Sequence, residues 1–242
     1  MYLSRIKLDT GRNATRRAIA SPQILHAAIE NCFGALPEKI EKFENEQLSL
    51  FDEEDIYEKF DEVKKVEKTR KLWRLDFLEG DLYMLMVSIE PPDFTNFANQ
   101  FCAENEKGET KDYGKLLAKI KEGQHLYFRF RGNPVHSVPV KNGERGKIYP
   151  HVTANQKKEW FIKKAQTNGF ALDENSFDLI ETGEMKFWRE SENKNRQVVV
   201  NYGVFEGLLE VLDAALFIQA LTQGIGRAKA YGCGMITVIG VR

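Results

Sequence analysis

The chain has 242 residues, of which 42% are hydrophobic and 29% are charged, and its formal net charge is -1. This composition is typical of a globular protein of one large or two small domains. No apolar run approaches the roughly 18 residues that a membrane span needs, and the basic N-terminus lacks the apolar stretch of a secretory signal. We therefore expect a cytoplasmic protein without a membrane partner.

Three cysteines are present, Cys32, Cys102 and Cys233, and they are far apart in the sequence. They form no Cys-x2-Cys pair and no His/Cys cluster at the spacing of zinc ligands. An odd number of separated cysteines favours free thiols in a reducing compartment. The pattern predicts neither a metal site nor another cofactor.

An acidic segment at about 37–67 offsets the positive net charge of the rest of the chain. It holds 12 acidic and 5 basic residues, so the other residues carry a net charge of +6. A basic face is the electrostatic signature of a polyanionic partner, although this excess is equally compatible with an ordinary solvated surface. The segment has few apolar residues, and we expect a mobile insert that faces away from nucleic acid.

The first predicted elements are a strand and a helix. Residues 1–8 alternate between two faces and predict a strand. Ser21 and Pro22 have the residue types of a helix N-cap and a first helical position, and Gly34 is expected to end that helix. The apolar face of this helix consists of Leu25, Ala28, Ile29, Cys32 and Phe33.

Three further segments follow the acidic insert. Residues 71–90 contain two β-rich runs on either side of Glu79-Gly80-Asp81, which predicts a hairpin. Residues 91–102 predict a short helix. The local pattern does not decide whether residues 111–120 form a helix or a strand.

The clearest strand lies at 124–138, where alternate side chains divide into an apolar set and a mostly polar set. The apolar set is Leu126, Phe128 and Phe130, and the opposite set is Tyr127, Arg129 and Arg131. The next element is a helix over 153–169, with Thr153 as its N-cap and Gly169 as its stop.

The remaining residues predict strands, a helix and a final strand. Residues 170–211 have the composition of two or three strands with a polar, basic connection near 186–196. Asp213 is the predicted N-cap of the next helix. Residues 235–241 predict the last strand.

Both halves of the chain approximate the element order β-α-β-β-α-β of a ferredoxin-like domain. The halves share this pattern without sequence identity. We therefore expect an α+β protein of two tandem ferredoxin-like, RRM-like βαββαβ domains, at 1–121 and 122–242, which fits the length.

A glycine-rich segment, GIGRAKAYGCG, occupies 224–234, just before the last strand. Its glycines are Gly224, Gly226, Gly232 and Gly234, and its cations are Arg227 and Lys229. A dinucleotide-binding loop does not fit, because a helix precedes the segment and the glycine spacing differs. Two interpretations stay open: a bend that lets a helix pack closely on a sheet, and a backbone concavity that receives a nucleic-acid phosphate.

The glycine-rich segment resembles the C-terminal loop of CRISPR repeat-RNA endoribonucleases, and most closely that of the CasE family, the RNA-processing subunit of type I-E Cascade complexes. Further stretches agree with this family in order and spacing. They are MYLSRI at the start, the helix that carries His26, LYFRFRGNPV in mid-chain and FEGLLEV before the last helix. The resemblance covers nearly the whole chain, with the acidic insert as the main exception.

The resemblance implies tandem ferredoxin-like domains and metal-independent cleavage of CRISPR precursor RNA at the base of a repeat stem-loop. The partners that it implies are the repeat RNA hairpin and the other Cascade subunits. It also implies that 111–120 is the fourth strand of the first domain. The family's catalytic histidine corresponds to His26. Many members have a tyrosine three residues earlier, where this chain has Gln23, so that role is either lost or supplied elsewhere.

The surroundings of His26 agree with an acid–base role. Its neighbours at helical spacing are Gln23, Ile29 and Glu30, which places it at the border of the apolar stripe, half-shielded and reachable. The ordinary pKa of a histidine lies near neutral pH. It can therefore take the proton of an RNA 2′-hydroxyl or give one to the leaving 5′-oxygen, and the sequence leaves both roles open.

Several polar side chains are candidates for holding RNA or stabilising the phosphorane. Positioning or transition-state support is expected from Gln23, Arg129, Arg131 and Lys229. RNA binding is expected from the glycine-rich segment with Arg227 and Lys229, from Lys157, Lys158, Lys163 and Lys164, and from Lys186, Arg189, Lys194 and Arg196. The last two groups are equally compatible with a solvated surface. The alternative function is an RNA-hairpin-binding subunit without catalysis.

Overall fold

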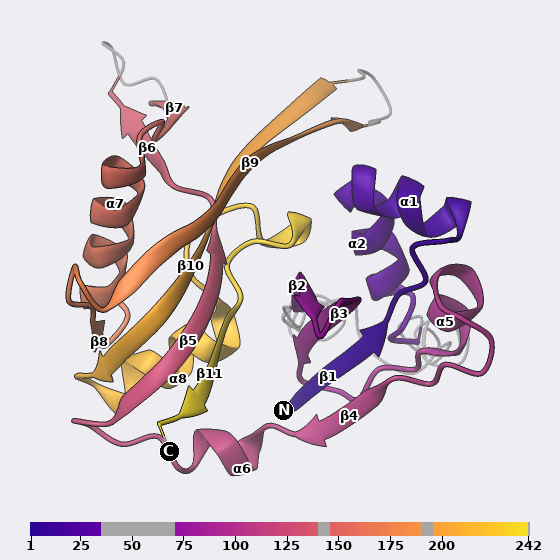
Figure 1. The fold of residues 1–242 in the computed structure, drawn as a ribbon, viewed down its shortest axis with the longest axis horizontal. Coiled ribbons are helices and arrows are strands. Elements are labelled where there is room, and N and C mark those ends of the chain that lie inside the picture. Colours follow the sequence, from indigo (N-terminus) through magenta and orange to yellow (C-terminus); the bar gives the residue numbers. More distant parts are fainter. Residues whose placement is uncertain (35–70, 140–145, 190–195, 242) are drawn as a thin grey trace, which may run out of the picture.

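The computed structural model describes residues 1–34, 71–139, 146–189 and 196–241. The predicted acidic insert lies outside these ranges. Within them the chain is a mixed α+β protein built on two larger antiparallel sheets, one from each half of the sequence (Figure 1). None of the helices in these ranges has the length and apolar character that a membrane crossing requires.

The N-terminal sheet has the strand order β2-β3-β1-β4, and each neighbouring pair is antiparallel. Its strands are β1 (Tyr2–Lys7), β2 (Leu72–Leu78), β3 (Asp81–Ser88) and β4 (Glu109–Asp112). Its helices are α1 (Asn13–Ala20), α2 (Pro22–Glu30) and α5 (Thr95–Phe101). Side chains of all three helices pack with the sheet in one buried cluster, which includes Ala18, Ile29, Met84 and Phe97.

The C-terminal sheet has the order β11-β5-β10-β8, and β9 also pairs with β10. Its strands are β5 (His125–Gly132), β8 (Phe170–Ala171), β9 (Phe177–Arg189), β10 (Arg196–Val211) and β11 (Ile236–Gly240). Its helices are α7 (Ala154–Gln166) and α8 (Ala214–Gln223). Two smaller elements are the helix α6 (Gly114–Leu117), between the two sheets in sequence, and the sheet of β6 (Val135–Val138) with β7 (Lys147–Pro150).

The two sheets share a core. Leu72 and Val87 of the N-terminal sheet belong to the same buried cluster as Phe128, Phe130 and Phe217 of the C-terminal half. The seam between the sheets is therefore a packed interface, and side chains from both halves can hold one site together.

The alternation predicted for the strand at 124–138 is confirmed in β5. Leu126, Phe128 and Phe130 are buried, and the Phe130 ring stacks on Phe161 of α7 with 4.6 Å between the ring centroids. A strand with one apolar face thus holds its covering helix by aromatic packing.

Short-range signals for turns and caps are also confirmed. Glu79 and Gly80 have φ values of 53° and 88° between β2 and β3, as a two-residue hairpin turn requires. Thr153 forms a capping box with Gln156 at the start of α7. The Asp213 side chain accepts the N–H of Leu216 at 2.9 Å at the start of α8.

The strand that the resemblance implied at 111–120 is wrong for most of its length. The fourth strand is Glu109–Asp112, and Gly114–Leu117 form a helical turn. The Asp112 carboxylate accepts the N–H of Gly114 at 2.9 Å, and this local turn takes the chain out of the sheet.

The helix around His26 differs from its prediction at both ends. The backbone N–H of Ser21 donates to the Arg17 carbonyl at 3.0 Å, so Ser21 closes α1 as it opens α2, and its side chain makes no cap hydrogen bond. The helix α2 ends at Glu30, before Gly34. The helix α1, in which only Thr15 and Ala18 are buried, was not predicted.

The polar, basic residues predicted to connect two strands near 186–196 belong in part to the strands themselves. Lys186 and Arg189 lie within β9 and Arg196 begins β10, so the polar residues continue the strand pair. Lys194 lies outside the described part of the chain. Consecutive β pairing extends this hairpin as an arm beyond the rest of the sheet (Figure 1).

Candidate active site and nucleic-acid interface

The glycine-rich segment forms a loop between α8 and β11, with a short 3-10 helix, η1 (Lys229–Tyr231), in its middle. The two ends of the loop are joined, because the N–H of Ile225 donates to the carbonyl oxygen of Gly234 at 2.8 Å. The N–H of Gly234 donates to the carbonyl oxygen of Arg131 in β5 at 2.6 Å. The base of the loop is therefore attached to the C-terminal sheet.

The glycines of this loop let it approach the N-terminal sheet. All four have positive φ, between 72° and 91°. A Cβ atom on Gly224 would lie 2.7 Å from Cδ2 of Leu72, and a Cβ atom on Gly232 would lie 2.9 Å from Cζ3 of Trp73. Both neighbours belong to β2, so close packing is one physical reason for glycine at these two positions.

The loop also meets the helix that carries His26. Cα atoms of η1 come within 8 Å of Cα atoms of α2, so two segments far apart in sequence lie together (Figure 1). The His26 side chain is 40% exposed, which leaves the imidazole reachable from solvent. Its Nδ1 atom lies 4.0 Å from Oε1 of Glu30, whose Oε2 lies 2.5 Å from Nζ of Lys71.

Gln23 lies one turn before His26 on α2. Its side chain is half-buried, and its Oε1 atom is buried without a hydrogen-bond partner among the residues that the structure describes. An amide does not titrate near neutral pH, so Gln23 can orient a neighbouring group but cannot exchange a proton.

The two cations of the loop differ in their surroundings. Nζ of Lys229 donates to the carbonyl oxygens of Gln223 and Gly224, each at 2.7 Å, and so caps the C-terminal end of α8. The Arg227 side chain is exposed and has no hydrogen bond or ion pair within the described ranges. Of the two, Arg227 is the one whose charge faces solvent.

The arginines of β5, from which positioning or transition-state support was expected, both contact side chains of the protein itself. Nε of Arg129 lies 3.2 Å from Oδ1 of Asp76, and its Nη1 forms an ion pair with Glu206. The Arg131 guanidinium lies over the ring of Tyr202, 3.8 Å from the centroid. Both arginines are thus engaged by neighbours within the protein.

The four lysines of α7 do not share one face. The Lys157 side chain is buried, and its ammonium donates to Oγ1 of Thr182; burial lowers the pKa of this lysine. Lys158 forms an ion pair with Asp178 at 2.8 Å. Lys163 is exposed and Lys164 is half-buried, and neither side chain forms a hydrogen bond or ion pair within the described ranges, so these two are the α7 lysines best placed for RNA.

The β9–β10 arm packs on the glycine-rich loop, which the sequence analysis missed. Phe187 of the arm contacts Tyr231 of the loop with 4.8 Å between the ring centroids, and Val200 and Cys233 complete this buried cluster. Lys186 of the arm forms an exposed ion pair with Glu184 at 2.6 Å. The period-two alternation of 185–187 is the signal that marks Phe187 as inward-facing.

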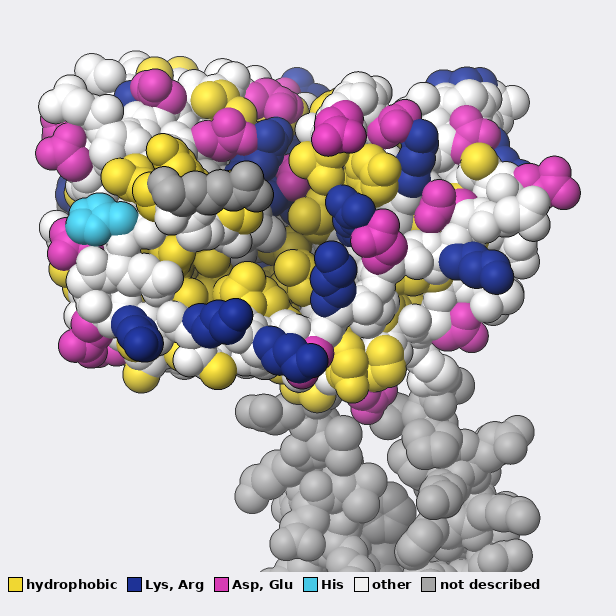
Figure 2. Space-filling view, turned by 60° about the horizontal axis from the view of Figure 1, so that its bottom comes forward, with side chains coloured by type: hydrophobic (Ala, Val, Ile, Leu, Met, Phe, Trp, Pro, Cys, Tyr) yellow, Lys and Arg dark blue, Asp and Glu magenta, His cyan; other side chains and the backbone are white. Residues whose placement is uncertain are grey.

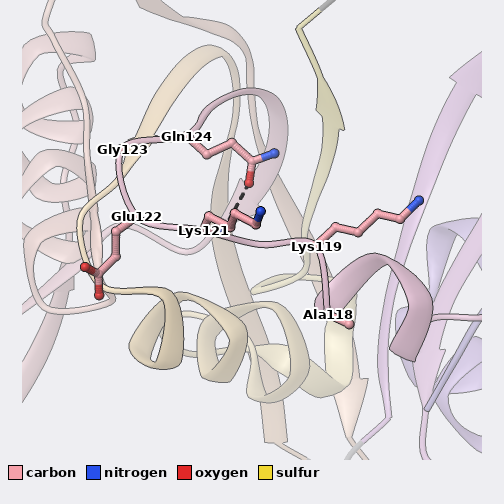
Figure 3. Close-up of a pocket in the computed structure, with 6 residues that line it drawn as sticks. All are labelled: Ala118, Lys119, Lys121, Glu122, Gly123 and Gln124. Carbon is pink, nitrogen blue, oxygen red and sulfur yellow. Dashed lines mark hydrogen bonds between the residues drawn. The ribbon is translucent and has the colours of Figure 1, made fainter.

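Two surface hollows lie at the end of the molecule that carries α6. A groove of about 440 Å³ between β4, α6 and β11 is lined by apolar residues such as Leu3 and Val238, with Lys111, Lys115 and Lys119 among its lining residues. Figure 2 looks onto this end and shows hydrophobic side chains in a hollow beside lysine and arginine side chains. The second pocket is lined by Ala118, Lys119, Lys121, Glu122, Gly123 and Gln124, and the Gln124 side chain accepts the N–H of Lys121 at 3.2 Å (Figure 3). No residue of α2 lines either hollow, so neither hollow belongs to the His26 site.

No group of three or more His, Cys, Asp or Glu side chains that could hold a metal ion occurs in the described parts of the chain. The buried cysteines are free thiols. The charged groups nearest to His26 in the structure are the Glu30 carboxylate, one turn away, and Lys71, which pairs with that carboxylate.

A family model described as CRISPR associated protein matches residues 1–239. The chain belongs to this CRISPR-associated family. The CRISPR-associated endoribonuclease Cse3 of Thermus thermophilus is 24% identical to it over 246 residues, which cover 98% of this chain and 99% of Cse3. The CRISPR system Cascade subunit CasE of Escherichia coli is 29% identical over 128 residues, which cover 50% of this chain and 60% of CasE.

The fold of this family member is similar to solved structures. A structure of the CRISPR endoribonuclease Cse3 bound to a 19-nucleotide RNA has a TM-score of 0.71 at 22% identity, over 99% of this chain and 100% of that chain. At this identity the likeness establishes the α+β fold, and it agrees with the resemblance inferred from the glycine-rich segment.

Proposed function

We propose that this chain is a metal-independent endoribonuclease that cleaves CRISPR precursor RNA at the base of a repeat stem-loop, which yields mature CRISPR RNA. The observation that carries the proposal is the packing of the glycine-rich loop, near the C-terminus, against the helix that bears His26. Membership of the CRISPR-associated family and the full-length similarity to a protein named as an endoribonuclease support it.

The chemistry follows from the RNA and from His26. The 2′-hydroxyl beside the scissile phosphate is the nucleophile, and His26 takes its proton or protonates the leaving 5′-oxygen. The products are a 2′,3′-cyclic phosphate or 3′-phosphate and a 5′-hydroxyl. Because Glu30 lies on the Nδ1 side of the imidazole, Nε2 is the atom left for RNA. The further acceleration comes from in-line positioning and from stabilisation of the phosphorane by Arg227.

The proposed RNA-binding surface is smaller than the sequence analysis suggested. Its cations are the exposed Arg227, the α7 residues Lys163 and Lys164, and the arm residues Lys186 and Arg189, together with the backbone of the glycine-rich loop. Arg129, Lys157 and Lys229 are excluded from it, because their charged groups are occupied inside the protein. Recognition of an A-form stem by phosphates and shape suits such a dispersed set of cations.

The fold proposal is two tandem ferredoxin-like domains, at 1–121 and 122–242. It is supported by two equivalent strand orders, β4-β1-β3-β2 and β11-β5-β10-β8, in which all neighbouring strands are antiparallel. In the N-terminal half, α1 and α2 lie between β1 and β2, and α5 lies between β3 and β4. In the C-terminal half, α7 lies between β5 and β8, and α8 lies between β10 and β11.

We also propose that the protein keeps its cleaved hairpin and joins other Cascade subunits. The partial similarity to the E. coli protein named as a Cascade subunit supports this proposal. Retention of the product is expected because most of the cations proposed to hold the stem, those of α7 and of the β9–β10 arm, have no role at the bond that is cut.

The decisive experiment is single-turnover cleavage of a CRISPR-repeat hairpin in EDTA. The hairpin is tested with its scissile 2′-hydroxyl intact and with that position deoxy. Cleavage of only the intact hairpin, with 5′-hydroxyl and cyclic-phosphate ends, is the expected result. Binding of both hairpins without cleavage, with or without magnesium, would favour the non-catalytic subunit, and cleavage that needs magnesium would overturn the metal-independent mechanism.

A further inference from the structure

A buried pair of opposite charges lies on β2. Arg74 is 1% exposed and Asp76 is 3% exposed, and both point to the same side of the strand because they are two residues apart. Nε of Arg74 donates to Oδ1 of Asp76 at 2.8 Å, and Nη2 donates to Oδ2 at 2.6 Å. Both ions are thus paired in bidentate geometry, as burial of charge requires.

The other donors of Arg74 cross the seam to the C-terminal sheet. Nη1 donates to the carbonyl oxygen of Arg129 in β5 at 2.7 Å and to that of Met235 at 3.0 Å. Nη2 donates to Oγ1 of Thr237 in β11 at 2.8 Å. Apart from Asp76, every acceptor of this guanidinium belongs to the opposite half of the molecule.

Arg74 is the last of three consecutive β2 residues that hold the glycine-rich loop. Leu72 lies against Gly224 at the start of the loop, and Trp73 lies against Gly232 near its end. Arg74 binds the carbonyl oxygen of Met235, the residue that follows the loop directly. The N-terminal sheet thereby contacts the loop at its entry, near its end and at its exit.

The charge network continues into the C-terminal sheet. Asp76 also attracts Arg129, which forms an ion pair with Glu206 of β10. Two cations and two anions therefore alternate across the seam, as Arg74, Asp76, Arg129 and Glu206. A neutral network of this kind fixes direction and distance more strictly than apolar packing does.

Stabilisation of the fold alone does not account for such a network. Replacing a buried ion pair by apolar side chains of similar volume is often neutral or stabilising. What an arginine supplies here, and an apolar side chain cannot, is hydrogen bonding to two backbone carbonyls at the exit of the loop and in β5. The useful consequence is a defined position of the loop relative to the N-terminal sheet.

We infer that Arg74 is a positioning residue for the proposed cleavage reaction, which sets the glycine-rich loop of one half against His26 of the other half. The inference rests on the proposed function. His26 and the loop come from different sheets, so their relative position depends on the seam. A displacement of about 1 Å at a reacting centre can lower a rate by about 10²-fold. RNA binding also uses Lys163 and Lys164 of α7 and Lys186 and Arg189 of the arm, which Arg74 does not contact, so affinity should depend on Arg74 less than the rate does.

The test compares Arg74→Met, Arg74→Lys and the double variant Arg74→Met with Asp76→Asn. The double variant avoids a lone buried carboxylate if Arg74→Met does not fold. Arg5→Met is the matched control, because Arg5 forms an exposed ion pair with Glu109 at 2.8 Å within the same sheet and away from the seam. For each protein we would measure thermal unfolding, affinity for a 2′-deoxy repeat hairpin, and single-turnover cleavage of the intact hairpin in EDTA.

The expected result is a cleavage rate at least 10-fold lower in the folded methionine variants, with affinity within about 3-fold of wild type. Arg74→Lys should rescue part of the rate, and Arg5→Met should leave it unchanged. Folded variants that cleave at the wild-type rate, a parallel loss of rate and affinity, or loss of the fold in every variant would overturn the inference. A wild-type protein that does not cleave the hairpin at all would overturn the proposed function itself.

Discussion

Nδ1 of His26 lies 4.0 Å from a carboxylate oxygen of Glu30, one turn further along α2. The carboxylate is itself held by Lys71 at 2.5 Å from its other oxygen. Glu30 lies on the Nδ1 side of the imidazole, so Nε2 is the atom that we propose exchanges a proton with RNA. Lys71 holds the Glu30 carboxylate, Glu30 lies beside the imidazole, and His26 is the residue proposed to exchange the proton.

Substitution of His26 by alanine should separate chemistry from binding. His26→Ala is expected to keep hairpin affinity within a few-fold and to lower the single-turnover cleavage rate by roughly 10² or more, the usual effect of losing a general acid or base. Because the side chain is 40% exposed, its removal should leave the fold intact. Rates are measured at saturating protein, and affinity is measured on a 2′-deoxy hairpin. The control is His125→Ala, at an exposed histidine of β5. Cleavage by His26→Ala at near the wild-type rate would show that His26 has no part in the mechanism.

The neighbours of His26 on α2 should matter less than His26 itself. Glu30→Gln and Gln23→Ala remove groups that orient the imidazole or the RNA but do not exchange the proton, so each should lower the cleavage rate by less than His26→Ala does. Gln23→Tyr restores the residue type expected from the resemblance and should raise the rate. The same single-turnover series measures all three. A loss with Gln23→Ala as large as with His26→Ala would show that the amide has a more direct role.

The two loop cations should give different phenotypes. Arg227→Ala is expected to leave stability within about 0.5 kcal/mol and to reduce the slope of log affinity against log salt by about one, because an exposed cation is lost. Lys229→Ala should lower the free energy of unfolding by about 1 to 2 kcal/mol, because it uncaps two carbonyls of α8. Urea unfolding and a salt titration of hairpin binding measure the two effects. The assignment fails if Arg227→Ala leaves the salt slope unchanged.

The glycine-rich loop should not accept a side chain where it packs on β2. Gly232→Ala is expected to lower the free energy of unfolding by about 2 to 4 kcal/mol, because a residue with φ of 76° is strained and its Cβ would lie 2.9 Å from Trp73. Gly240→Ala is the control, since a Cβ atom there has no neighbour within 4 Å. Equal melting curves for the two variants would show that Gly232 is not needed for packing.

Much of the fold was predictable because its signals are local. The alternation in β5, the Thr153 and Asp213 caps and the turn at Glu79-Gly80 depend on residues a few positions apart. The start of β4 and the helix α1 were missed because their patterns are weak. In β4 all four side chains are exposed, so period-two burial gives no signal there.

The residues of the candidate site could be predicted from the sequence, but the side-chain contacts that they make could not. His26 and the glycine-rich segment were both predicted to be functional, and the structure brings their two segments together. It could not show that Lys229 caps α8 or that Lys157 reaches Thr182, because both contacts depend on tertiary packing. Arg74 and Asp76 share a strand face by spacing alone, yet only the docking of the second sheet makes that face buried.

The buried thiols predict how stability depends on pH. Burial raises the pKa of Cys32 and of Cys102 to about 12 and that of Cys233 to about 11, from an ordinary pKa of 9.0. Between these values the unfolded chain loses the thiol proton and the folded chain keeps it. The contribution of each thiol to stability is therefore fully present below about pH 9 and is lost as the pH rises through 11 to 12.

Cys102→Ala isolates one of these thiols, at a position just after α5. The variant loses some stability at every pH, because a buried side chain becomes smaller. Its disadvantage relative to wild type should shrink above pH 9, by up to about 1.4 kcal/mol for each pH unit. Urea unfolding of both proteins between pH 7 and 10.5, with reductant present, measures the difference. A difference that stays constant over this range would show that the Cys102 thiol titrates alike in the folded and unfolded chains.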